Sequence, residues 1–71
     1  MKIDIKPIQS ELQELAGSIP VKVKLDKHMD VATSIRETGK GFLVRFNPAR
    51  FRSPKKLEAH LTMCRDAVGE D

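Results

Sequence analysis

The strongest constraint on the fold lies in the last third of the chain, which predicts an amphipathic helix over residues 54–68. Ser53 is a typical N-cap, Pro54 suits the first helical position, and Gly69 stands just past the expected end. The apolar side chains of this helix recur about one turn apart and form one stripe: Leu57, Leu61, Cys64 and Val68. A helix with a single apolar stripe must cover a core, so the rest of the chain has to supply one.

Three alternating runs precede this helix and predict strands. In residues 21–25, apolar and charged side chains alternate, which indicates a half-buried strand with its charged face in water. Residues 31–36 and 42–46 also alternate, and the glycine-containing connection over residues 37–41 is typical of a β-hairpin. Residues 3–5 alternate as well, which leaves a short additional strand open at the start.

A shorter helix is expected between residues 7 and 17. Pro7 suits the first helical position, and Gly17 and the Pro20 that follows must end the helix. Its apolar stripe is Ile8, Leu12, Leu15 and, in the exit turn, Ile19.

The resulting order is helix, three strands, helix, which predicts an α+β fold of αβββα order. We expect one domain over residues 1–71, with a three-stranded antiparallel sheet and both helices packed on one face. A chain of 71 residues buries only about 60% of its unfolded surface, which leaves little room for both a core and a deep catalytic cleft. The core face of the sheet should carry Val21, Val23, Leu25, Phe42, Val44 and Phe46.

The cysteine content, the apolar runs and the net charge of the chain narrow the choice of compartment and of partner. A single cysteine excludes an internal disulfide, and the start of the chain lacks the pattern of a signal peptide, so we expect a cytoplasmic protein. The sequence contains no apolar run near the ~20 residues that cross a bilayer, so no membrane partner is expected. Thirteen Lys and Arg against ten Asp and Glu give a net charge of +3, which favours an acidic protein or a nucleic acid as partner.

Residues 31–68 resemble the strand-to-helix segment of the SprT-like zincin metallopeptidases. The last predicted strand ends in Asn47-Pro48, a few residues lead to an N-cap, and the next helix carries His60 and Cys64 four residues apart. In that family this helix carries His-Glu-x-x-His. His60 stands at the position of the first metal-binding histidine and Cys64, four residues later, at the position of the second. The resemblance implies a reduced relative of the zincin core.

The departures from that motif predict a protein that is not an enzyme. Leu61 stands where the family has the glutamate that takes a proton from zinc-bound water, and leucine cannot accept a proton. The seven residues after Cys64 contain no histidine or cysteine for a third ligand, so no metal or other cofactor is expected. His60 and Cys64 nevertheless share one helical face, which leaves open a metal-binding hydrolase remnant completed by a partner chain. Otherwise Cys64 is a small buried hydrophobe.

The order of elements is also similar to that of the double-stranded-RNA-binding domain. In that family a histidine after the first strand enters a minor groove, and a Lys-Lys pair at the start of the last helix contacts phosphates. His28 and the pair Lys55-Lys56 match these positions, whereas Phe51 and Arg52 replace the glycines of that family. The resemblance implies nucleic-acid binding as an alternative function.

Two basic surfaces are predicted. The first surrounds the start of the final helix, where backbone N–H groups and the helix dipole also favour anions: Arg50, Arg52, Lys55 and Lys56. The second is the outward face of the sheet, which lacks aromatic residues for base stacking: Lys22, Lys24, Arg36 and Arg45. We expect an anion at the helix start, because backbone donors add directional hydrogen bonds there. The sequence therefore predicts a non-catalytic binding or interaction module with a basic surface.

Overall fold

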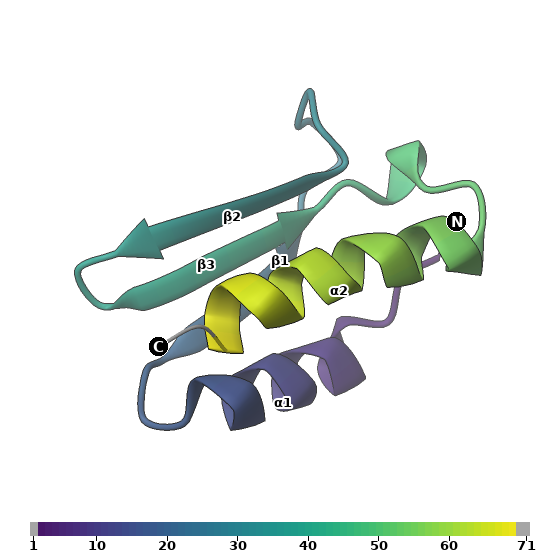
Figure 1. Ribbon diagram of the computed structural model, residues 1–71. Coiled ribbons are helices and arrows are strands. Elements are labelled where there is room, and N and C mark those ends of the chain that lie inside the picture. The colour runs from purple at the N-terminus through teal and green to yellow at the C-terminus, as the bar shows by residue number, and fades with distance from the viewer. Residues whose placement is uncertain (1, 70–71) are drawn as a thin grey trace.

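The computed structural model describes residues 2–69 as a three-stranded sheet with two helices on one face (Figure 1). The elements, in chain order, are α1 (Ile5–Ala16), β1 (Val21–Leu25), β2 (Thr33–Thr38), β3 (Gly41–Phe46), the 3₁₀ helix η1 (Pro48–Arg50) and α2 (Pro54–Gly69). The α+β fold and the αβββα order that the sequence predicts are confirmed.

The sheet is mixed, so the expectation of a fully antiparallel sheet was wrong. Its order is β1-β3-β2, with β3 parallel to β1 and antiparallel to β2. The strand β3 lies at the centre, and its Val44 and Phe46 are fully buried. The loop over residues 26–32 therefore carries the chain past β3 to the far edge instead of turning straight back beside β1.

The expected hairpin between β2 and β3 is confirmed. Thr38 pairs with Gly41 across a two-residue turn. Gly41 has a φ of 143°. It lies against Pro20, whose carbonyl oxygen accepts a hydrogen bond of 2.9 Å from the N–H of Phe42. The strand β2 begins at Thr33, later than the sequence indicates.

The helix α1 begins at Ile5, two residues before the expected start at Pro7. Asp4 is the N-cap, and its carboxylate accepts a hydrogen bond of 3.1 Å from the N–H of Lys6. Pro7 is tolerated in this first turn, because the first four N–H groups of a helix have no intrahelical partner. The short additional strand is therefore absent, and Ile3 lies buried in the core instead.

The core lies between the helices and the inward face of the sheet, and is made of Ile3, Ile8, Leu12, Val21, Val23, Val44, Phe46, Phe51, Leu61, Cys64 and Val68. Three residues expected there, Leu15, Ile19 and Leu25, are instead 45–48% exposed. Leu25 is the last residue of β1, Ile19 lies beyond the end of α1, and Leu15 lies one residue before that end. Phe51, which the sequence did not place in the core, is only 1% exposed.

The helix α2 starts where the sequence predicts. The hydroxyl oxygen of Ser53 accepts a hydrogen bond of 3.2 Å from the N–H of Lys56, as an N-cap does. The predicted apolar stripe is buried or packed against the core, and the helix continues through Gly69 rather than ending before it. Within residues 2–69, neither helix combines the length and the apolar character needed to cross a membrane.

Candidate anion-binding site

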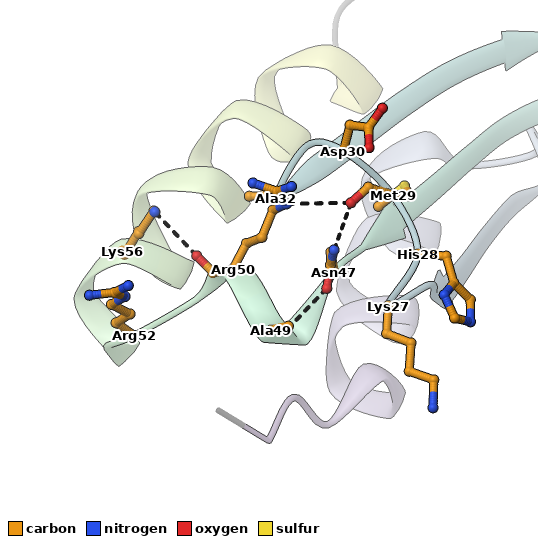
Figure 2. A pocket seen from close by; sticks show the side chains of 10 residues that line it. All are labelled: Lys27, His28, Met29, Asp30, Ala32, Asn47, Ala49, Arg50, Arg52 and Lys56. Atoms are coloured by element: carbon orange, nitrogen blue, oxygen red, sulfur yellow. Dashed lines mark hydrogen bonds between the residues drawn. The ribbon is translucent and has the colours of Figure 1, made fainter.

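A hollow of about 870 Å³ separates the β1–β2 loop from the segment that joins β3 to α2 (Figure 2). We call it the basic hollow; it is lined by Lys27, His28, Met29, Asp30, Ala32, Asn47, Ala49, Arg50, Arg52 and Lys56. Four of these side chains are cationic, and Asp30 is the one carboxylate among them. The two walls come from segments far apart in the sequence, so the fold and not the local sequence assembles this charge.

Asn47 holds the two walls together. It is 3% exposed, and its amide Nδ2 donates a hydrogen bond of 2.8 Å to the carbonyl of Met29 in the loop. Its Oδ1 accepts a hydrogen bond of 3.0 Å from the N–H of Ala49, and its own N–H donates to the carbonyl of Ala32 at 2.8 Å. Because a buried amide needs partners for its polar atoms, these contacts fix the loop against η1.

Two cations of the hollow are positioned by backbone carbonyls. Arg50 donates from Nε to the carbonyl of Met29 at 3.3 Å, and Lys56 donates from Nζ to the carbonyl of Arg50 at 3.2 Å. Figure 2 shows Arg52 and Lys56 on one side of the hollow and Lys27 on the other. These carbonyls orient the cations without neutralising their charge.

The structure gathers most of the predicted helix-start cluster in the basic hollow. Arg50, Arg52 and Lys56 line it, whereas Lys55 is exposed on α2 outside the lining. His28, singled out by the resemblance to RNA-binding domains, lies in the opposite wall. Lys27 was missed, because its place in the lining of the hollow depends on the hydrogen bonds that Asn47 makes with the loop and has no signal in the local sequence.

The second predicted surface also forms. The strand register places all four expected cations on the sheet face opposite the helices: Lys22, Lys24, Arg36 and Arg45. Lys24 stands directly beside Arg45, and such like-charge neighbours repel. Arg45 reaches the carboxylate of Asp26 at 3.3 Å, but its buried Nε has no hydrogen-bond partner among the described residues.

His60 and Cys64, the residues at zincin ligand positions, make core contacts. Nδ1 of His60 lies 2.9 Å from the hydroxyl of Thr33, and its ring meets Phe51 edge-on with centroids 5.0 Å apart. Burial raises the pKa of the Cys64 thiol to about 11, and the smaller effect of Arg65 lowers it. Zinc binds the thiolate form, so this environment disfavours metal binding by Cys64. Residues 2–69 bring no three histidine, cysteine, aspartate or glutamate side chains together as a metal site.

Comparisons with protein-family models, with curated proteins and with solved structures found no match. The resemblances to SprT-like peptidases and to double-stranded-RNA-binding domains therefore stay predictions from residue patterns.

Proposed function

We propose that this chain is a non-catalytic binding module that holds an anionic group of its partner in the basic hollow. The observation that carries the proposal is the convergence of Lys27 from one wall with Arg50, Arg52 and Lys56 from the other. Cations that share one space repel one another, and an anion bound between them relieves that repulsion. Arg52 and Lys56 also flank the start of α2, where the helix dipole favours negative charge.

Duplex RNA is the alternative partner. It is supported by His28 and Lys56, which match contact positions of RNA-binding domains and line the same hollow. Asp30 weighs against it, because a carboxylate in the hollow repels phosphate. Asp30 also repels the carboxylates of an acidic protein segment, but these stand on flexible side chains that can turn away from Asp30.

The absence of catalysis is supported by the α2 residues at the zincin positions. Leu61 is buried and cannot serve as a general base. A metal-binding hydrolase completed by a partner chain would require Cys64 to leave the core and to lose the thiol proton that burial holds in place. Incubation of the protein with zinc and unfolded casein should give no cleavage. Cleavage that is lost in His60→Ala would overturn this part of the proposal.

We also propose a cytoplasmic location. The support is the unpaired thiol of Cys64, the single cysteine of the chain, since free thiols persist in reducing compartments. Fractionation of the source cell with redox-sensitive markers tests this location. Recovery with oxidised, exported proteins would contradict it.

A matched pair of variants tests the basic hollow. Arg52→Gln/Lys56→Gln removes two charges from the hollow, and Lys22→Gln/Lys24→Gln removes the same charge from the sheet face. Chemical-shift titrations with phosphate, polyglutamate and a short RNA duplex would then be compared. We expect the first variant to bind more weakly and to flatten the salt dependence, and the second to change little.

Three outcomes of these titrations decide the proposal. Shifts in the walls of the hollow with polyglutamate support an acidic protein partner. Strong binding of the RNA duplex alone, with a steep salt dependence, supports the alternative. Shifts confined to the sheet face, or no shifts with any probe, would overturn the basic hollow as the binding site.

A further inference from the structure

The two edges of the sheet are finished in different ways, and the edge at β1 is closed by α1. In the parallel ladder with β3, the N–H and C=O groups of Val21 and Val23 point away from the sheet. The side chain of Gln9 accepts a hydrogen bond of 2.8 Å from the N–H of Val23 and donates to the carbonyl of Val21. Gln13 accepts a hydrogen bond of 2.8 Å from the N–H of Val21. These two glutamines occupy the positions that a neighbouring strand would fill.

The edge at β2 is open. The N–H of Asn47 donates to the carbonyl of Ala32 at 2.8 Å, which shows which residues of the antiparallel ladder bond to β3 and which point outward. By alternation, the N–H and C=O groups of Thr33, Ile35 and Glu37 point away from β3. No side chain within residues 2–69 hydrogen-bonds to the backbone of these three residues. Figure 1 shows β2 at the edge of the sheet away from α1.

The side chains along this open edge differ between its two faces. On the face away from the helices, β2 presents Arg36, which is exposed and has no ion pair among the described residues. On the helix face it presents Ile35, which packs at the rim of the core. His60 reaches Thr33, so this side of α2 borders β2, and Met63 three residues further along is 52% exposed.

We propose that the β2 edge accepts an extended segment of a protein partner in which acidic and apolar residues alternate. The backbone of that segment would bond to the free groups of Thr33, Ile35 and Glu37 and become a fourth strand. Its acidic side chains would lie beside Arg36 on the basic face, and its apolar side chains beside Ile35 on the helix face. This edge is separate from the basic hollow, so the two proposals stand or fall independently.

A second copy of this chain fits the edge less well, and charge is the reason. Antiparallel pairing of two β2 edges would form one continuous sheet with both helical layers on the same side. The open faces of the two copies would then adjoin, each with Lys22, Lys24, Arg36 and Arg45. Each chain already carries a net charge of +3, so an acidic partner relieves repulsion that a second copy would increase.

The test uses the isotope-labelled protein and synthetic peptides of alternating glutamate and valine. Binding should shift the amide signals of β2 and slow the hydrogen exchange of Thr33, Ile35 and Glu37. Two further peptides carry N-methyl groups either on every valine or on every glutamate. In a β-ladder only one of these two sets faces β2, so one methylated peptide should bind at least about tenfold more weakly and the other should keep most of its affinity.

Variants of the protein supply the matched controls. Glu37→Pro removes an edge N–H without breaking the ladder to β3, and Glu37→Ala removes the same charge but keeps the N–H. We expect only the proline variant to lose peptide affinity. Arg36→Glu should weaken binding of the glutamate–valine peptide and strengthen binding of a lysine–valine peptide, whereas Arg52→Gln/Lys56→Gln should leave the exchange protection of the β2 amides by the glutamate–valine peptide unchanged.

Several results would overturn the proposal. Equal loss of affinity by both methylated peptides would exclude ladder pairing, as would shifts without exchange protection in β2. Stronger binding of the lysine–valine peptide to the unchanged protein would exclude an acidic partner. A concentration-dependent dimer that protects the same three amides without any peptide would identify a second copy as the occupant.

Discussion

Gly41 and Pro20 approach each other so closely that a Cβ atom added to Gly41 would lie 2.1 Å from the carbonyl oxygen of Pro20. The contact exists because that carbonyl accepts the first hydrogen bond of the parallel β1–β3 pair, from the N–H of Phe42. The positive φ of Gly41 also disfavours any L side chain. The join between the turn after α1 and the hairpin therefore depends on a glycine at position 41.

Gly41→Ala should lower the free energy of unfolding by at least about 2 kcal/mol, because it adds backbone strain to a steric clash with backbone atoms. Gly39→Ala is the matched control in the same hairpin, since a Cβ there meets nothing within 4 Å. Urea denaturation of both variants measures the difference. Equal stability of the two variants would contradict the close approach of Gly41 to Pro20.

Gln9→Ala should destabilise the protein by about 1–2 kcal/mol, because it leaves two backbone groups at the β1 edge without their partner. Glu14→Ala is the control, since Glu14 is exposed on the same helix and its side chain makes no hydrogen bond among the described residues. Thermal unfolding compares the stability of the two variants.

We also expect Gln9→Ala/Gln13→Ala to self-associate at high concentration, because it uncovers the backbone groups of the β1 edge. A stable monomer would show that these glutamines do not protect the edge.

Phe51→Ala should be among the most destabilising substitutions in the chain, at about 3–5 kcal/mol. Phe51 is 1% exposed and meets Phe46 and His60 edge-on, with ring centroids 6.1 Å and 5.0 Å away. Phe42→Ala is the control, and it should cost less because Phe42 is only partly buried. Denaturant unfolding ranks the two. A larger loss of stability in Phe42→Ala than in Phe51→Ala would contradict the structure, in which Phe51 is the more deeply buried of the two.

Local signals in the sequence predicted the parts of the fold that depend on local chemistry. Ser53 and Pro54 marked the start of α2, and the glycines of the hairpin marked its turn, because N-caps and turns are decided by a few neighbouring residues. The cationic sheet face also followed directly, since strand alternation alone places Lys22 and Lys24 on the same side.

Features that depend on distant contacts could not be predicted in this way. The three strands compete for the central position of the sheet, and alternation within each strand does not decide that β3 takes it. Gln13 has an ordinary helical position in the sequence, yet it closes the β1 edge. Lys27 joins the basic hollow only because Asn47 holds its loop against η1. Each of these assignments requires the three-dimensional arrangement.

Burial of Cys64 raises the pKa of its thiol to about 11. In the unfolded chain a thiol titrates near its ordinary pKa, about 8.5. Between these two values the unfolded state releases the proton first. The contribution of the thiol to stability is therefore complete below about pH 8.5 and is lost as the pH rises toward 11.

Within that window the free energy of unfolding should fall by up to about 1.4 kcal/mol per pH unit relative to Cys64→Ala, which has no thiol to titrate. Lysine titration affects both proteins equally, so the difference between their urea curves isolates the thiol. At neutral pH, reaction of Cys64 with a thiol reagent should be slow in the native protein and fast in denaturant. Parallel pH curves for the two proteins, or rapid labelling of the native state, would show that Cys64 is accessible and is not held in the core between α2 and the sheet.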